Sequence, residues 1–334
     1  MEYIQQLLAL TNRPAFCVED GTVTAANDAA RSRQILPGDP VEPLLASGGE
    51  ALSEFTQGFL CLTLALPGQQ VSATVTALGQ RRIFTLEPEQ TAEEFHLLSL
   101  ASQELRAPLS DVMAMVESLP AELEQLAGIN RGLHRLLRLI GNMSPHPTPR
   151  MELMDVNELL RELWDKTLPA CEVRGIRFRF TPSPAPVYSC VDGELLNRAI
   201  YNLLSNAIKF SGGELELQVS QHRQSYRISL RDTGGSLPAL GQDPFARFLR
   251  EPGLGDPSCG MGLGMRLVRS AAQAHGGTVL MDEPPGGGIR VTLTLPMRQN
   301  LSHLSGPRLR VSYTGERDPM LVELSDVLPD SFYQ

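Results

Sequence analysis

Apolar residues recur every three or four positions through residues 91–144, a spacing that predicts two amphipathic helices. The first stripe consists of Leu98, Ala101, Leu105, Leu109, Val112, Val116 and Leu119, and the second of Leu126, Ile129, Leu133, Leu136, Ile140 and Met143. Two helices alone cannot enclose both stripes, so we expect the hairpin to form a four-helix bundle from two chains. The pattern leaves open whether the second chain is a copy of the first.

Before this hairpin, the pattern changes to short runs rich in β-branched and aromatic residues. A helix is expected over residues 3–10, and the Asp20-Gly21 pair between two short apolar runs predicts a tight β-hairpin. Further strands are expected over residues 58–66, 70–78 and 81–86. Residues 1–88 are therefore predicted to form an α/β domain of their own.

A second helical pattern, over residues 202–210, carries candidate chemistry. Asn202, Asn206 and Lys209 share one face at i, i+4 and i+7, while Leu204 and Ile208 face a core. An amide carbonyl suits a hard cation and an ammonium suits an anion, so this face fits a phosphate with bound magnesium. Lysine occurs only at positions 166 and 209, so a lysine at position 209 indicates a specific role.

Glycine-rich segments follow that helix. Residues 232–238 place a carboxylate before a flexible turn, residues 245–250 contain two phenylalanines, and residues 260–268 alternate glycines before a helical pattern. Glycines let backbone N–H groups approach phosphate oxygens, and a helix start favours an anion. One such turn is weak evidence, but all the segments in this order indicate a polyphosphate pocket.

The four segments resemble the catalytic domain of sensor histidine kinases, within the wider group of type II topoisomerases and heat-shock chaperone ATPases. In that family they are called the N box, first glycine box, F box and second glycine box. The resemblance implies an α/β sandwich over residues 150–298 that binds ATP with Mg²⁺. The implied cofactor-binding residues are Asn202, Asn206, Lys209, Phe210, Asp232, Gly234, Gly260, Gly262, Leu263 and Gly264.

The same resemblance assigns individual roles. Asn206 would hold Mg²⁺, Lys209 would touch phosphate, and Asp232 would accept a hydrogen bond from the adenine amine. Ser236 stands where the family usually has a second glycine, which implies a stiffer turn without loss of binding. His275 is expected to be structural, closing a helix with Gly276 as its left-handed cap.

Residues 102–109 resemble the family's phospho-acceptor motif, Ser-His-Glu-Leu-Arg-Thr/Ala-Pro-Leu, but Gln103 replaces the histidine. An amide nitrogen delocalised into its carbonyl is a very poor nucleophile. Glu104 keeps the position of the general base, which has no nucleophile to activate. Ala107 also lacks the hydroxyl or amide that phosphatase members use to position water. Autophosphorylation on this chain's own acceptor is therefore expected to be lost.

Several functions stay open. The leading hypothesis is a two-component signalling protein that binds Mg-ATP and either changes shape or phosphorylates a partner's histidine, with a response regulator or partner kinase as its partner. One alternative is an active kinase that uses another histidine; His96 lies seven residues before Gln103 on the same helix face, and His134 lies on the second helix. Another is a non-catalytic scaffold. A simple ATPase ranks last, because Asn202 replaces the water-activating glutamate.

Composition narrows the setting. The net charge of −9 argues against a nucleic-acid partner, and the longest apolar run, residues 59–67, is too short to insert into a membrane. Five cysteines far apart indicate reduced thiols, hence a cytoplasmic protein. Residues 15–27 resemble a PAS domain, although no flavin or haem motif identifies a ligand.

The chain is predicted to be a multidomain α+β protein. Its expected parts are a PAS-like α/β sensor over residues 1–88, a dimerisation hairpin over 91–144, an α/β sandwich ATP-binding domain over 150–298 and a β extension over 299–334, with strands at 308–313 and 320–324.

Overall fold

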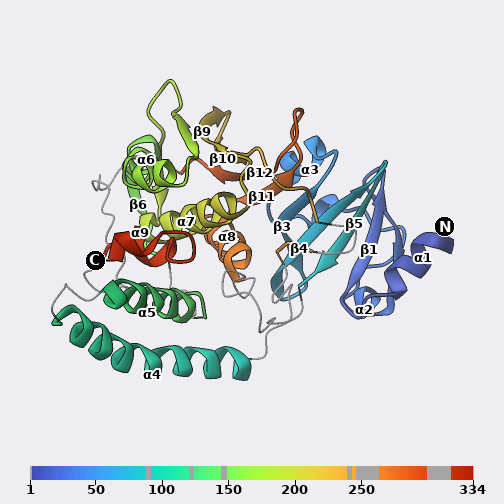
Figure 1. The fold of residues 1–334 in the computed structure, drawn as a ribbon. Helices are drawn as coiled ribbons and strands as arrows, with labels where there is room; N and C mark the ends of the chain where they lie inside the picture. The colour runs from blue at the N-terminus through green and yellow to red at the C-terminus, as the bar shows by residue number, and fades with distance from the viewer. Residues whose placement is uncertain are drawn as a thin grey trace.

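A ten-stranded sheet runs through the molecule (Figure 1). The structure, a computed structural model, describes residues 2–87, 92–119, 124–143, 149–238, 243–245, 263–298 and 317–333. In order across the sheet, the strands are β2 (Thr22–Ala26), β1 (Ala15–Glu19), β5 (Arg81–Leu86), β4 (Gln69–Leu78), β3 (Phe59–Leu66), β11 (Thr278–Asp282), β12 (Arg290–Pro296), β10 (Ser225–Asp232), β9 (Glu214–His222) and β7 (Arg177–Thr181). A separate two-stranded sheet consists of β6 (Glu152–Asp155) and β8 (Tyr188–Val191). The fold is α+β, as predicted.

The N-terminal part contributes half of the large sheet. Its elements are α1 (Glu2–Ala9), β1 (Ala15–Glu19), β2 (Thr22–Ala26), α2 (Asp28–Arg31), η1 (Glu42–Leu44), α3 (Gly49–Glu54), β3 (Phe59–Leu66), β4 (Gln69–Leu78) and β5 (Arg81–Leu86). The predicted strands are confirmed to within a residue or two. The hairpin turn has positive φ at Asp20 (50°) and Gly21 (74°), the left-handed geometry that an Asp-Gly pair tolerates. Phe16 and Phe84 stack at 4.7 Å in the core of this part.

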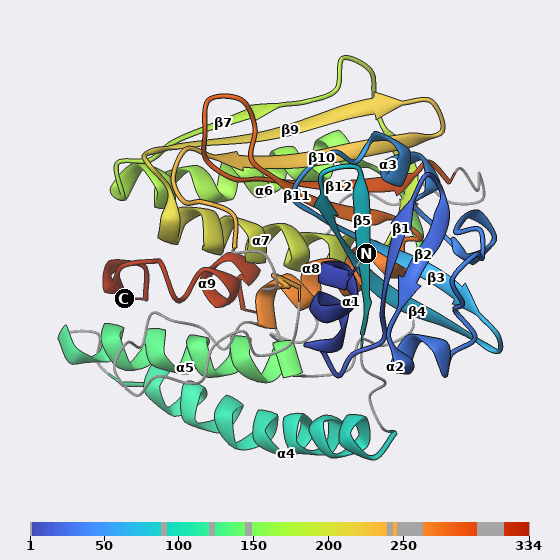
Figure 2. The same cartoon turned by 90° about the vertical axis from the view of Figure 1, so that its right-hand side faces the viewer.

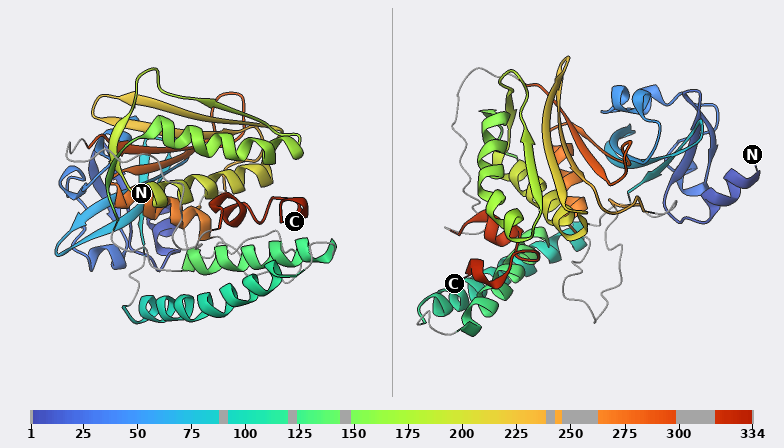
Figure 3. Two further views of the ribbon diagram at one scale, coloured as in Figure 1. Left: turned by 90° about the vertical axis from the view of Figure 1, so that its left-hand side faces the viewer. Right: turned by 45° about the horizontal axis from the view of Figure 1, so that its top comes forward.

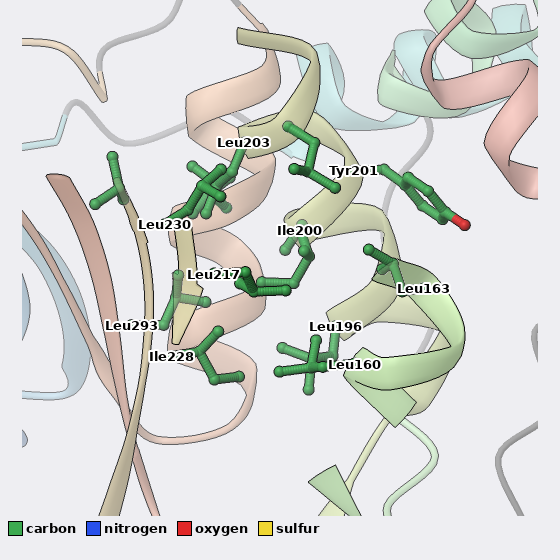
Figure 4. Packing of buried hydrophobic residues seen from close by; sticks show 14 of the residues in the cluster. Leu160, Leu163, Leu196, Ile200, Tyr201, Leu203, Leu217, Ile228, Leu230 and Leu293 are labelled. Atoms are coloured by element: carbon green, nitrogen blue, oxygen red, sulfur yellow. The ribbon is translucent and has the colours of Figure 1, made fainter. Parts of the chain in front are cut away.

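The other half of the sheet belongs to the second large part of the chain. Its elements are β6 (Glu152–Asp155), α6 (Val156–Val173), β7 (Arg177–Thr181), β8 (Tyr188–Val191), α7 (Gly193–Phe210), β9 (Glu214–His222), β10 (Ser225–Asp232), α8 (Leu263–Ala274), β11 (Thr278–Asp282) and β12 (Arg290–Pro296). Helices α6 and α7 pack on one face of the sheet through a dense apolar core, which Figure 4 shows between Leu163, Ile200 and Leu230.

The two halves join where β3 pairs antiparallel with β11, so neither strand is a free sheet edge. Ion pairs support this junction, among them Arg269 of α8 with Glu87, the residue after β5, and Arg13 with Asp243, 3.2 Å apart. Arg269 is only 2% exposed. The arrangement makes one continuous sheet from segments that the sequence places in separate domains.

The helical hairpin consists of α4 (Ala92–Glu117) and α5 (Glu124–Met143), which pack against each other as predicted. It lies beside the ATPase-like part, along the side where α7 and α8 lie (Figure 2). Part of its apolar surface is covered: Leu109, Met113, Leu137 and Ile140 form a cluster with Val322 from the C-terminal segment. Another part is exposed, namely Leu105, Val112, Leu119, Ile129 and Leu136, each between 45% and 50% exposed.

The described part of the C-terminal segment, residues 317–333, is helical, which corrects the prediction of a strand over residues 320–324. It forms α9 (Pro319–Glu323) and the 3-10 turn η3 (Asp330–Tyr333). The Asp318 side chain caps α9 by accepting the N–H of Met320 at 2.9 Å, and Pro319 fits the first helical turn. Asp318 followed by Pro319 is a helix-start signal in the sequence. The predicted strand at 308–313 lies outside the described residues.

Figures 1 and 3 show this C-terminal segment between α5 and α7. Its side chains Leu324, Val327 and Leu328 are at most 2% exposed and belong to the main core. Among the described residues, no helix combines the length and the hydropathy that crossing a membrane requires.

Candidate functional site

Helix α7 holds the predicted phosphate-binding face. The helix begins at a capped residue, Asp192, whose carboxylate accepts the Leu195 N–H at 2.9 Å. Asn202 is fully buried, Asn206 and Lys209 are partly exposed, and Phe210 at the end of the helix is 56% exposed. The predicted spacing therefore does bring the two amides and the ammonium to one side of α7.

The adjoining end of α8 secures this helix start. His275 is buried, its Nδ1 contacts the Ala271 carbonyl at 2.7 Å, and its Nε2 accepts the backbone N–H of Asp192 at 3.0 Å. Burial lowers the pKa of His275 below its usual 6.5, which keeps the ring neutral and able to accept that bond. Gly276 follows with φ 73°, so the structural role predicted for this pair is confirmed.

The polar groups of Asn202 are all engaged. Its Nδ2 donates to the Arg198 carbonyl at 2.9 Å and to Glu323 Oε2 at 3.1 Å, while its Oδ1 accepts Arg138 Nη2 at 3.0 Å. Two of these partners come from elements outside the ATPase-like part: Arg138 from α5 and Glu323 from α9. Asn202 therefore lies at a junction of three segments distant in sequence.

Lys209 is engaged in the same way. Its Nζ pairs with Asp326 Oδ2 at 2.9 Å, and the same carboxylate binds Arg138 Nη1 at 2.7 Å and Arg135 Nε at 2.9 Å. Burial alone would raise the pKa of Asp326, but Arg138, Lys209 and Arg135 together lower it below 3.8. Asp326 is thus a carboxylate held in its charged form by several cations.

Glu323 is the most deeply buried acid in this region, with no exposed surface. Arg198 Nε lies 3.3 Å from its Oε1, and Arg138 Nε lies 3.4 Å from its Oε2. A buried carboxylate needs such partners, because an isolated charge loses its hydration without compensation. Glu323 and Asp326 were missed at the level of sequence, since neither belongs to a motif and only the fold brings them to α7.

Asp232 closes the other end of the site, at the C-terminus of β10. It is 7% exposed, and its Oδ1 accepts the Gly234 N–H at 2.9 Å. Burial raises its pKa to about 6, an effect reduced by that bond. Gly288 packs over the same residue with φ 79°, and a Cβ there would lie 1.9 Å from the Asp232 carbonyl oxygen. This close approach explains the glycine turn near β12.

The second glycine box meets the N box directly. Helix α8 begins at Leu263, and a Cβ on Gly264 would lie 2.9 Å from Asn202 Oδ1, so a glycine allows the two helices to approach. Gly260 and Gly262 lie outside the described residues, as does the F box beyond Phe245, which is buried. The structure therefore places Gly264 of the second glycine box against Asn202, and Gly234 of the first glycine box against Phe210 at the end of α7.

The acceptor-like residues Gln103 and Glu104 lie in α4, and the Glu104 side chain is exposed. His96 lies in the same helix, and its side chain is outside the described atoms. His134 in α5 is only 4% exposed; its Nδ1 contacts the Asn130 carbonyl at 2.8 Å and its ring meets Tyr333 edge-on at 5.0 Å. A side chain enclosed in this way is poorly accessible to ATP, which argues against His134 as the phospho-acceptor.

The implied magnesium site can be tested against these contacts. Magnesium prefers oxygen ligands such as amide carbonyls. No hydrogen bond joins the Asn206 side chain to another described residue, so its carbonyl suits the assigned role. The Asn202 carbonyl faces a guanidinium instead, which would have to leave before that oxygen met a cation. The donor chemistry thus fits Mg²⁺ at Asn206.

Known proteins share this arrangement. Residues 191–299 match the family described as histidine kinase-, DNA gyrase B-, and HSP90-like ATPase. The sensor histidine kinase CpxA of Escherichia coli K12 is 28% identical over 69% of this chain and 52% of its own length. The alginate biosynthesis sensor protein KinB of Pseudomonas aeruginosa is 29% identical over 63% of this chain and 38% of its own. The chain spans about half, or less, of the length of these relatives.

A solved structure is similar as well. Full-length ShkA in complex with AMPPNP is 25% identical, with a TM-score of 0.51 over 61% of this chain and 46% of that one. The matched ATPase family, the sensor kinase relatives and the meeting of α7, β10 and α8 agree with one another. Residues 191–299 are therefore a histidine kinase-, DNA gyrase B-, and HSP90-like ATPase domain, and the chain is similar to sensor histidine kinases.

Proposed function

We propose that this protein binds Mg-ATP and serves two-component signalling without an acceptor histidine of its own. The observation that carries the proposal is the approach of α7, β10 and α8: Asn202 lies against Gly264, and Asp232 lies buried at the end of the neighbouring strand. The similarity to full-length ShkA, whose solved structure is in complex with AMPPNP, supports the nucleotide assignment.

Roles follow from chemistry within this geometry. The Asp232 carboxylate is an acceptor for the adenine amine, and burial strengthens a hydrogen bond to it. Lys209 supplies a positive charge for phosphate, and Asn206 supplies an oxygen for Mg²⁺. We assign Asn202, Phe210, Gly234, Leu263 and Gly264 to the same site, and Gly260 and Gly262 to the second glycine box as further N–H donors.

Phosphotransfer within the chain lacks its nucleophile. Gln103 stands at the acceptor position of α4, beside an exposed Glu104 that has no imidazole to deprotonate. The γ-phosphate would then pass to a histidine on a partner protein, or ATP binding would only change the chain's shape. The second candidate is transfer to His96, seven residues earlier in the same helix. A scaffold that does not transfer phosphate is the third.

Dimerisation through the hairpin is part of the proposal. Leu105 and Val112 on α4, and Leu119 two residues beyond its end, recur every seven residues, and Ile129 and Leu136 do so on α5; all of them are about half exposed. A heptad stripe left open to solvent is suited to a second hairpin. A homodimer is favoured because an identical stripe is then always present. A response regulator is the expected downstream partner.

The remaining assignments complete the proposal. Residues 1–88 would be a PAS-like sensor, and their sheet is continuous with that of the ATPase domain. The protein is proposed to act in the cytoplasm, without nucleic acid and without inserting into a membrane.

The deciding experiment compares the full-length wild type with Gln103→His after incubation with γ-labelled ATP and Mg²⁺. We expect nucleotide binding by both proteins and acid-labile label only on the variant, because the substitution restores the missing nucleophile. His96→Gln is the matched control, and it should change neither result. Label on the wild type that disappears in His96→Gln would contradict the acceptor-deficient assignment and favour the second candidate. Absence of nucleotide binding would leave only the scaffold.

A further inference from the structure

The C-terminal segment, residues 317–333, contacts side chains assigned to the phosphate end of the proposed nucleotide site. We propose that it is an intramolecular competitor of Mg-ATP, and that its carboxylates Glu323 and Asp326 take the place of phosphate oxygens. The inference rests on the proposed ATP binding and adds its regulation: the structure is a closed state, and nucleotide enters when the segment leaves.

The contacts of the N-box side chains motivate the proposal. Asn202 Nδ2 binds Glu323 Oε2 at 3.1 Å, and Lys209 Nζ binds Asp326 Oδ2 at 2.9 Å. Of the three residues on the phosphate-binding face of α7, these two are already engaged by acids from one short segment. A phosphate group could not bind the same atoms until both carboxylates had withdrawn.

The chemistry of the surrounding surface agrees. Basic side chains from two helices surround the two acids: Arg135 and Arg138 from α5, with Arg198 and Lys209 from α7. Guanidinium and ammonium groups bind carboxylate and phosphate oxygens through the same charge-assisted hydrogen bonds. A surface of this kind accepts either anion, and binding of one excludes the other.

The segment also holds the hairpin against the ATPase domain. Val322 lies in the apolar cluster of α4 and α5, while Leu324 and Val327 lie in the core of the ATPase domain. Asn130 Nδ2 donates to the Tyr333 carbonyl at 3.1 Å, and Arg131 Nε donates to the Ser325 carbonyl at 3.0 Å. Figure 2 shows α9 between α5 and α7. Movement of α5 away from α7 would therefore remove Arg135 and Arg138, two of the cations that hold the acids in place, which links the hairpin to nucleotide access.

A purely structural role for the segment makes a different prediction. Buried carboxylates paired with arginines can simply complete a core, and removing them would then lower stability without changing nucleotide affinity. Competition requires that removing the two charges raises the affinity. Affinity and stability can be measured separately, so the two roles are distinguishable.

The test uses the full chain with Glu323→Gln and Asp326→Asn together. These substitutions keep the side-chain size, remove both charges and replace one acceptor oxygen of each acid with an NH2 donor. Asp330→Asn is the matched control: it lies in the same segment, is 56% exposed, and pairs with Arg131 at 3.1 Å away from the N box. Affinity for a fluorescent ATP analogue with Mg²⁺ is measured by titration, and thermal unfolding shows that each protein is folded. We expect at least ten-fold tighter binding by the double variant, and a change within two-fold for the control.

A second measurement on the wild type makes the test independent of any substitution. Amide hydrogen exchange over residues 320–328 is followed with and without a saturating, non-hydrolysable ATP analogue and Mg²⁺. Faster exchange upon binding is expected if the segment is displaced. Equal affinities for the wild type and the double variant, or unchanged exchange with nucleotide bound, would overturn the competition while leaving ATP binding intact. If none of the proteins binds nucleotide, ATP binding fails and the competition fails with it.

Discussion

The two ends of the proposed nucleotide site differ in how they are completed. At the adenine end, Asp232 accepts the Gly234 N–H, Gly288 lies against the Asp232 carbonyl, and Gly234 lies against Phe210 at the end of α7, so these contacts stay within the ATPase domain. At the phosphate end, Asn202 and Lys209 come from α7, and their partners come from α5 and the C-terminal segment. The adenine end is built within the ATPase domain, whereas the phosphate end includes side chains from α5 and the C-terminal segment.

This difference indicates which part of the site can be regulated. A site built within one domain is fixed once that domain has folded, because all of its contacts belong to that domain. A site whose partners lie on separate elements changes when those elements move, and its binding energy is then coupled to their positions. In this protein the shared end includes the hairpin, the element that carries the acceptor-like residue.

The largest expected effect concerns the adenine end. Asp232→Asn replaces a charged acceptor with an amide, and a hydrogen bond to a charged group contributes about 1.5–3 kcal/mol, so nucleotide affinity should fall by roughly 10- to 150-fold. Titration with a fluorescent ATP analogue measures the loss. The fall should be similar in the wild type and in the Glu323→Gln/Asp326→Asn background, because the adenine end is independent of the C-terminal segment. A change confined to one background would break the proposed separation of the two ends.

The next effect is a pH dependence at the same residue. Because burial raises the pKa of Asp232 to about 6, the carboxyl is mostly charged at pH 7 and mostly protonated at pH 5. If the charged form is the one that binds adenine, nucleotide affinity should decrease about ten-fold between pH 7 and pH 5. Asp326 adds no change in that window, since its pKa is held below 3.8. Asp232→Asn serves as the control and should remove the difference; a full pH dependence in that variant would assign it to another group.

A smaller effect tests the shared end. Lys209→Met removes a phosphate contact, and it also removes one cation that holds Asp326. In the wild type, losing the phosphate contact lowers nucleotide affinity, while losing a cation beside Asp326 weakens the competing segment and raises affinity. In the Glu323→Gln/Asp326→Asn background only the loss of the phosphate contact remains. The affinity loss should therefore be about five-fold larger in that background, a non-additivity of the size that neighbouring residues show. Equal losses in the two backgrounds would mean that Lys209 does not link the segment to the phosphate site.

The smallest effect is expected at Ser236, where the family usually has glycine. Among the described residues, positive φ occurs outside glycine only at Asp20, Gln34 and Arg223, so Ser236 needs no glycine-like conformation. The Ser236 side chain is also exposed. Ser236→Gly should change nucleotide affinity by less than about two-fold, since a surface substitution without a specific role alters little. A larger gain would show that this turn limits access to the adenine end.

The features of this protein that involve residues close together in sequence could be predicted from the sequence alone. Hydrophobic periodicity predicted α4 and α5, the Asp20-Gly21 pair predicted the first β-hairpin, and the spacing of Asn202, Asn206 and Lys209 predicted one polar face on α7. Each of these features depends on residues within about two turns of helix or one turn of chain, where backbone geometry fixes which side chains are neighbours. For the same reason Gly276 could be assigned as a helix cap before its φ of 73° was known.

The features that join distant segments depend on tertiary contacts, and no sequence pattern predicted them. The pairing of β3 with β11 joins segments more than 200 residues apart, and no local pattern specifies which strand meets which. The expected strand at residues 320–324 is a helix, and Glu323 and Asp326 carry no motif that would direct them to Lys209. Their position depends on apolar side chains such as Val322 and Leu324 being buried between α5 and α7, a summed packing effect that single-residue patterns do not encode.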